Sequence, residues 1–324
     1  MANNTREIRR RIKSINSTRK ITRAMEMVSA AKMRRAVAAV LAIRPYAHSA
    51  WSVLTNLARA FEQYGGHGML EVREVKSILM IVVSSNRGLC GAFNTNIARK
   101  IRYELDHPER LKMNRIGNKK IESTVKDGEL KVDYITIGRK AAEIIARVDG
   151  SDAHVIASFA HLTYQPKAEE VRPLAKLVMD EYLKKNYDKV VIVYTDYVSA
   201  INQQTKIRQV LPISKVDIEK QIAEIDQHAK EYGLVGPKVE YKIEPSPREV
   251  LEFIFPRLIE MQIFHAIEES NASKESARMI AMQNATDAAG DMAHSFTLAY
   301  NQIRQQKITQ EIAEISAGAA AIES

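Results

Sequence analysis

The feature that most constrains the fold of this sequence is a stretch near its C-terminal end, from Pro256 to Ser316, with the composition of one long helix. It contains a single glycine, Gly290, and no proline after Pro256. As one α-helix it would extend roughly 90 Å at about 1.5 Å per residue, and a helix of that length rarely stands alone in water. Residues 1–60 supply a partner, because they contain no glycine and one proline, Pro45, which should bend or split that helix. We therefore expect the two chain ends to form an antiparallel coiled coil.

Both segments have side chains in stripes at helical spacing. The N-terminal segment has a narrow stripe at three- and four-residue steps, namely Ile8, Ile12, Ile15, Thr22, Met25 and Ser29, flanked by Ile21 and Val28. The C-terminal segment has two short stripes, which are Phe296, Tyr300, Ile303 and then Ile308, Ile312, Ile315. The N-terminal stripe is narrow and has polar members, which is typical of contact with one helix rather than with a broad core.

Charge is concentrated at the N-terminal end. The formal net charge of the chain is +9. Residues 1–44 contain twelve basic side chains and two acids, Glu7 and Glu26, so this segment alone carries +10. The segment cannot neutralise itself, and we expect an acidic partner outside the chain.

In the middle of the chain the spacing of apolar residues changes from that of helices to that of alternating strands and helices. Apolar runs predict strands at Ser77–Val83, Val132–Ile137, His154–Phe159, Val190–Thr195 and, antiparallel, Gln204–Ile213. Helices are expected at Asn94–Leu105, Arg139–Arg147 and Ala168–Lys185, and an exposed loop or hairpin at 107–130. This alternation indicates a Rossmann-like α/β domain with a mainly parallel sheet. The predicted organisation is a coiled-coil helix at 1–64, an α/β domain at 72–245 and a second coiled-coil helix at 246–324.

The sequence contains few candidates for a catalytic, metal or cofactor site. The loop Arg87–Phe93 follows a strand and precedes a helix, where a nucleotide could bind, but its glycines do not match G-x-G-x-x-G. A structural turn is the favoured interpretation. Cys90, the single cysteine, is expected to be a small buried residue, and the eight histidines show no metal-ligand spacing. We expect no catalytic residue, no metal and no cofactor, and no apolar run is long enough to span a membrane.

Both ends of the sequence, and one loop, resemble a known family. The C-terminal match includes Leu298-x-Tyr300-Asn301-x-x-Arg304-Gln305 and Ile308-Thr309-Gln310-Glu311-Ile312, followed by Gly318-Ala319. The N-terminal match includes Lys20-Ile21-Thr22-x-Ala24-Met25-Glu26-Met27-Val28, and the middle adds Ser85-Asn86-Arg87-Gly88-Leu89-Cys90-Gly91. In these motifs, which follow the family's order along the whole chain, the sequence resembles the gamma subunit of F-type ATP synthase.

The resemblance implies a rotor shaft that couples ion translocation to ATP synthesis or hydrolysis, without an active site of its own. The implied partners are the alpha and beta subunits of the catalytic head, the epsilon subunit and the c-subunit ring, with only indirect membrane contact and no nucleic acid. The implied location is the cytoplasmic face of a bacterial cell membrane. The resemblance also implies that four residues contact the beta subunit, because they match positions that do so in the family. These residues are Met25, Arg304, Gln305 and Thr309.

Two other classes of protein stay open on the sequence alone. One is a basic coiled-coil adaptor or nucleic-acid binder, although the basic helix lacks aromatic residues for base stacking. The other is a dinucleotide-binding enzyme that uses the loop Arg87–Phe93. The coupling ion, the number of c subunits, the main direction of the reaction and the role of 214–244 stay undefined.

Overall fold

The structure is a computed structural model, and it describes residues 2–64, 68–116, 119–121, 130–150, 153–163, 166–213 and 246–323. The chain divides into two compact units. One unit combines residues 1–31 with 278–324, and the other comprises residues 32–277. The charged segment 214–244, expected to be weakly helical, lies outside the described residues.

A five-stranded sheet organises the unit 32–277, with strand order β5-β4-β1-β6-β7. The strands are β1 (Ser77–Val83), β4 (Lys131–Ile137), β5 (His154–Phe159), β6 (Lys189–Tyr197) and β7 (Gln203–Leu211). β5, β4, β1 and β6 are parallel, whereas β7 pairs antiparallel with β6. All five predicted strands are confirmed, including the direction of the last one.

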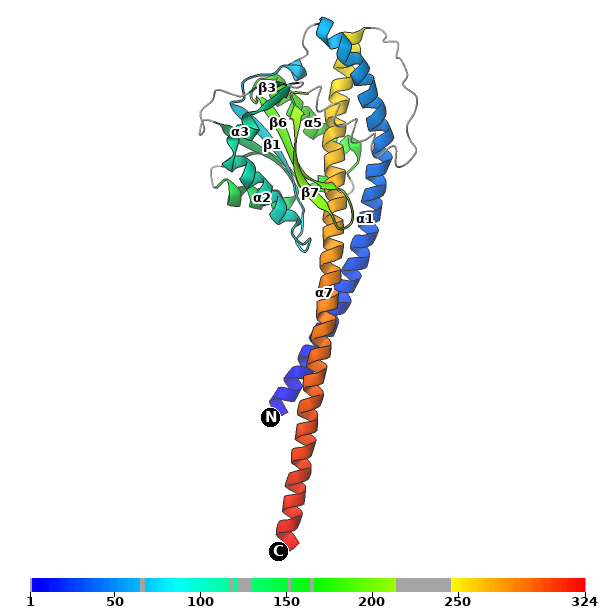
Figure 1. The fold of residues 1–324 in the computed structure, drawn as a ribbon, viewed down its shortest axis with the longest axis vertical. Coiled ribbons are helices and arrows are strands. Elements are labelled where there is room, and N and C mark those ends of the chain that lie inside the picture. The colour runs from blue at the N-terminus through cyan, green and yellow to red at the C-terminus, as the bar shows by residue number, and fades with distance from the viewer. Residues whose placement is uncertain are drawn as a thin grey trace. The chain divides into compact units, whose positions relative to one another are not determined.

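Helices cover both faces of this sheet, so the unit has three layers (Figure 1). The helices packed against the sheet are α2 (Phe93–Asp106), α3 (Pro108–Lys112), α4 (Arg139–Val148) and α5 (Ala168–Leu183), and part of α7 (Pro247–Glu323) joins them. Successive side chains of β1 point to opposite faces. Leu79 and Ile81 pack with α5 and α7, whereas Ile78 and Met80 pack with α2 and α4. The continuous apolar run of β1 is explained by burial on both faces.

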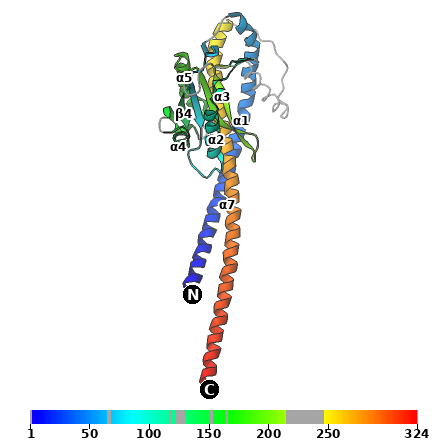
Figure 2. The ribbon, with the colours of Figure 1, turned by 60° about the vertical axis from the view of Figure 1, so that its left-hand side comes forward.

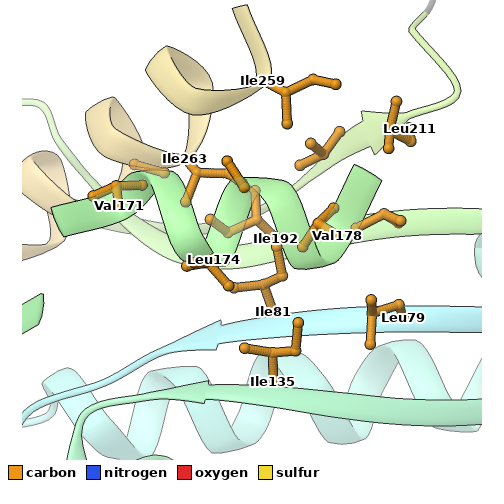
Figure 3. Packing of buried hydrophobic residues seen from close by; sticks show 14 of the residues in the cluster. Leu79, Ile81, Ile135, Val171, Leu174, Val178, Ile192, Leu211, Ile259 and Ile263 are labelled. Carbon is orange, nitrogen blue, oxygen red and sulfur yellow. The ribbon is translucent and has the colours of Figure 1, made fainter. Parts of the chain in front are cut away.

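Figure 3 shows the core on the α5 and α7 side. Ile81 of β1 and Ile192 of β6 point toward Leu174 of α5, and Ile259 and Ile263 approach from α7. These five side chains are at most 1% exposed. Burial of each contributes about 1.5–3 kcal/mol, so this part of α7 is fixed to the sheet by its apolar face.

The segment 107–130, predicted as an exposed loop or hairpin, contains an antiparallel strand pair that agrees with a hairpin and a helix that was not predicted. α3 lies at Pro108–Lys112, and a short antiparallel pair, β2 (Asn114–Ile116) and β3 (Lys119–Ile121), follows it. Two 3₁₀ helices complete the described elements, η1 (Gly68–Leu70) and η2 (Ala160–Thr163).

The two terminal helices are as long as the sequence predicts. α1 spans Ala2–Tyr64 and α7 spans Pro247–Glu323. The expectation that Pro45 could split the first helix is wrong, because α1 runs through it without interruption. Proline removes one backbone donor at a cost of about 3 kcal/mol, which is small beside the remaining bonds of a 63-residue helix. α7 likewise continues through Pro256.

Candidate functional site

Residues 2–31 of α1 and 278–323 of α7 form a two-helix assembly that we call the shaft. Arg9 lies over the ring of Tyr300, and Arg11 lies over the ring of Phe296. Farther along, the hydroxyls of Thr22 and Thr286 are 2.8 Å apart. Residues with higher numbers in α1 therefore contact residues with lower numbers in α7. The two helices are antiparallel, as predicted.

The seam between the two helices is narrow and built from small side chains. Ser29, Ala289 and Ala293 are buried there. A Cβ on Gly290 would lie 3.5 Å from the guanidinium carbon of Arg19. The predicted stripe is confirmed, because Thr22 and Ser29 are buried and its other members are half-buried, whereas the flanking Ile21 and Val28 are more than half exposed. Small residues at the seam let two helices approach closely, but they bury little apolar surface.

A polar pair occupies the middle of the seam. The Thr22 hydroxyl lies 3.0 Å from the carbonyl oxygen of Arg19, and the Thr286 hydroxyl lies 2.7 Å from that of Met282. Two hydroxyl hydrogens can serve two of the three oxygen contacts, so both groups can be satisfied although both are buried. A buried polar pair fixes the axial position of one helix against another.

The shaft uses part of its positive charge internally. Both acids of the N-terminal segment are paired, Glu7 with Arg11 at 2.8 Å and Glu26 with Arg23 at 3.1 Å. Lys13 and Lys20 are exposed and have no ion-pair partner among the described residues. The expected excess of positive charge therefore remains at the surface of α1.

α7 continues beyond the N-terminal end of α1, as both Figure 1 and Figure 2 show. Every residue from Arg304 to Gly318 is exposed. We call this stretch the C-terminal extension. Ile308, Ile312 and Ile315 follow one another at helical spacing along it and are 46%, 60% and 72% exposed.

Polar pairs support the extension as a helix. Lys307 lies 3.4 Å from Glu311, and the Gln310 side chain donates a hydrogen bond of 2.9 Å to Glu314. Pairs four residues apart stabilise an exposed helix by about 0.2–0.5 kcal/mol each. The extension thus has its own polar support and an apolar stripe without cover from the described residues.

The four residues expected to contact a beta subunit fall into two places. Arg304, Gln305 and Thr309 lie together on the extension, where the Thr309 hydroxyl donates to the Gln305 carbonyl oxygen at 3.0 Å. Met25 is half-buried on α1, just past the contact of Thr22 with Thr286. From there to Arg304 is roughly 25–30 Å along α7 at about 1.5 Å per residue. The structure does not bring Met25 together with the other three.

The loop after β1 is held by its own side chains. The side-chain amide of Asn94 donates to the Ser85 hydroxyl at 2.8 Å, and the side-chain oxygen of Asn86 accepts the backbone N–H of Arg139 at 2.9 Å. Leu89 has a φ of 60° and points outward with 64% exposure. Cys90 is buried, as predicted. These contacts are those of a structural turn.

Sequence reasoning missed a buried charged cluster where α7 meets β6 and β7. Burial opposes ionisation of Glu269, but His265, at 3.5 Å, and Arg208 outweigh it and lower the pKa of Glu269 to about 2. Burial and the charge of Glu269 raise the pKa of Asp196, which pairs with Lys206. The two carboxyls are 73 positions apart, and no sequence pattern links them.

In the part of the chain that the structure describes, no helix has the length and apolar character needed to cross a bilayer. The same residues contain no group of three His, Cys, Asp or Glu side chains arranged to hold a metal ion.

An antiparallel pair of terminal helices, an extension past the shorter helix and an α/β domain between them in sequence define a shaft-type subunit. A family model described as ATP synthase matches residues 4–322. The ATP synthase gamma chain of Legionella pneumophila (strain Corby) is 37% identical over 317 residues, which cover 98% of this chain and 99% of that relative. The gamma chain of Chloroflexus aurantiacus (strain ATCC 29366) is 37% identical over 322 residues, 99% of each chain. The chain therefore belongs to the family of ATP synthase gamma chains.

Solved structures agree on the fold. The rotor of Euglena gracilis mitochondrial ATP synthase in rotational state 1 matches with a TM-score of 0.60 at 18% identity, over 95% of this chain and all of that chain. The central stalk of the Tetrahymena thermophila mitochondrial enzyme matches with a TM-score of 0.55 at 21% identity, over 82% of this chain. The predicted family and fold class are confirmed. The function is that of a central stalk, the rotor that couples ion translocation to ATP synthesis or hydrolysis.

Proposed function

We propose that this rotor acts on the beta subunits through the C-terminal extension and, at a second level, through Met25. The observation that carries the proposal is the continuation of α7 beyond α1, with all of Arg304–Gly318 exposed. An apolar stripe that is about half exposed or more gains free energy when a partner covers it, up to about 1.5–3 kcal/mol for each isoleucine.

The chemistry of the extension suits a surface that turns against its partner. Arg304, Gln305 and Thr309 offer hydrogen bonds of modest strength to protein loops, and Arg304 adds a charge that matches an acidic loop. Ile308, Ile312 and Ile315 offer a smooth apolar stripe. Contacts that are few and individually weak can form and break as the shaft turns.

The asymmetric contacts of the shaft explain how it can act on the beta subunits. One shaft inside a ring of identical beta subunits touches each of them differently at any moment. A contact can shift the equilibrium between open and closed states only by its difference in free energy between those states. A difference of about 1.4 kcal/mol already changes that equilibrium tenfold, so a few polar contacts are sufficient.

The other assignments follow from this role. The partners are the alpha and beta subunits of the catalytic head, the epsilon subunit and the c-subunit ring, and contact with the membrane is indirect. We place the chain at the cytoplasmic face of a bacterial membrane, as a subunit without catalytic residues of its own. The exposed positive charge of α1, including Lys13 and Lys20, supports an acidic surface opposite it.

Arg304→Ala in the assembled enzyme tests the proposal. Loss of its contact with beta should lower ATP-driven ion pumping per ATP hydrolysed, while the subunit still assembles, because the side chain is exposed. Lys184→Ala, which removes an exposed cation at the end of α5, is the matched control and should leave pumping unchanged. Full pumping by the Arg304→Ala enzyme would contradict the assignment.

A further inference from the structure

A groove runs between α2 and α4 on the face of the sheet opposite α5, with a cavity of about 440 Å³. We call it the α2–α4 groove. Its floor contains Ala98, Ile144 and Val148, which pack against the core beneath α2 and α4. From Asn94 to Arg102 the groove follows α2 for roughly 12 Å at about 1.5 Å per residue. That length accommodates about two turns of a helix.

The rim of the groove is positively charged. Arg99 and Arg102 line it from α2, and Arg147 lines it from α4. The Arg99 guanidinium donates to the Asn96 side chain at 3.2 Å, and that of Arg102 donates to the backbone oxygen of Arg147 at 3.4 Å. None of these three guanidinium groups has a carboxylate partner among the described residues.

The one carboxylate that lines the groove is already engaged. Glu143 accepts two hydrogen bonds from Lys140, at 2.6 and 2.9 Å. This pair is locally neutral, so the rim keeps a net charge of about +3 from its arginines. Three like charges along one short groove repel one another, and an anionic ligand would relieve that repulsion.

We propose that the α2–α4 groove binds an acidic amphipathic helical segment of a protein partner. Apolar side chains three and four residues apart on such a segment would reach the floor, and carboxylates beside them would meet the rim. Arginine is suited to this role, because its planar guanidinium binds a carboxylate through two parallel hydrogen bonds. The groove is far from the shaft seam in sequence and uses none of the residues assigned to beta-subunit contact.

Two other anionic ligands fit less well. A planar bilayer would meet the arginine rim but could not reach the floor, because Ile144 is only 8% exposed and lies recessed between the helices. A free phosphate would leave the apolar floor, which contains Ala98, Ile144 and Val148, uncovered. The ligand must therefore be narrow and must carry apolar groups that contact the floor and anionic groups that contact the arginine rim.

The test is the binding of a labelled 14-residue peptide to the full chain, followed by fluorescence anisotropy at physiological ionic strength. The peptide carries leucine at positions i, i+3, i+4 and i+7 and glutamate elsewhere, and a scrambled peptide of the same composition is measured beside it. Arg99→Glu combined with Arg147→Glu should weaken binding of the first peptide by at least about tenfold, because two attractive contacts become repulsive. Both side chains are exposed, so the fold should persist, and circular dichroism checks that it does.

Matched variants distinguish binding in the α2–α4 groove from nonspecific attraction between the peptide and the net charge of the protein. Lys176→Glu with Lys184→Glu makes the same change in charge on and after α5, which covers the other face of the sheet, and should change the affinity less than about twofold. Ala98→Phe fills the floor without a change in charge and should weaken binding by about tenfold or more.

Three results would overturn the proposal. The first is equal affinity for the scrambled peptide, which would show attraction to net charge alone. The second is an equal loss of affinity in the α5 control. The third is binding of vesicles containing phosphatidylglycerol that is lost on reversal of Arg99 and Arg147 while the peptide fails to bind, which would assign the arginines to a membrane surface.

Discussion

The polar pair in the shaft seam allows a quantitative test of how the two helices are held. Thr286→Val and Thr22→Val each remove one buried hydroxyl, and valine has nearly the same shape as threonine. In each single variant the remaining hydroxyl keeps a carbonyl acceptor in its own helix, at 3.0 Å for Thr22 and 2.7 Å for Thr286. Each substitution should therefore cost about 1 kcal/mol, the net value of one hydrogen bond between neutral groups.

The double variant should cost less than the two single variants together. The bond between Thr22 and Thr286 is lost only once, and two valines make a shape-matched apolar contact at the same place. We expect a coupling free energy of about 0.5–1.5 kcal/mol from the double-mutant cycle. The control is Thr297→Val, because Thr297 donates to the Ala293 carbonyl oxygen at 2.7 Å but is exposed, so its removal should cost no more than about 0.5 kcal/mol.

Native-state hydrogen exchange is the suitable assay, because it reports the opening free energy of α1 and α7 amides within the shaft separately from the rest of the chain. Additive costs, with no coupling within about 0.3 kcal/mol, would refute a hydrogen bond across the seam. A cost for Thr297→Val equal to that for Thr286→Val would also refute it, since the effect would then lie within α7.

Two further substitutions test other parts of the structure. Gly290→Ala should stabilise the shaft by about 0.5–1 kcal/mol, because alanine favours a helix interior over glycine and its Cβ would meet the Arg19 side chain at an ordinary 3.5 Å; a lower melting temperature would contradict the seam geometry. Tyr187→Phe removes the hydrogen bond of 2.7 Å that the hydroxyl donates to Asp133. Burial raises the pKa of Asp133, but the Tyr187 hydroxyl and Lys131 outweigh it and hold that pKa below 3.8. The depressed pKa contributes stability above pH 3.8 that is lost as the pH falls below it. The variant should thus lose about 1.5–3 kcal/mol at pH 7 in urea unfolding and a smaller amount at pH 3, whereas equal losses at both pH values would contradict the pairing; Tyr103→Phe, at an exposed tyrosine, is the control.

The sequence alone predicts those elements whose burial produces a regular pattern of apolar residues. β1 is predicted at its observed bounds because both of its faces are buried, so every position from Ile78 to Val83 is apolar. The shaft seam is predicted equally well, because contact with one helix selects every third or fourth residue. The division into segments 1–64, 72–245 and 246–324 stays a prediction, since the two compact units describe the packing of the chain in a different way.

Features that depend on distant residues are not visible in the sequence. The pairing of Glu269 with Asp196 joins α7 to the end of β6, and the α2–α4 groove joins arginines from helices on either side of β4 in the chain. Each residue involved is an ordinary charged residue by itself. The position of Met25 relative to Arg304 also required the helix register, which Thr22 and Thr286 define.

The distribution of apolar side chains on the shaft argues that its stability depends on its partners. Ile21, Val28, Met292 and Leu298 are each more than half exposed, while the seam buries threonine, serine and alanine. A two-stranded coiled coil selected for stability alone would place all of its large apolar residues in the seam. Here these four face outward and several others are only half-buried, so part of the available hydrophobic free energy can be gained only when another surface covers them. The shaft should therefore become markedly more protected from hydrogen exchange on assembly with the catalytic head, and the protection should reach the C-terminal extension, which has no helix partner among the described residues.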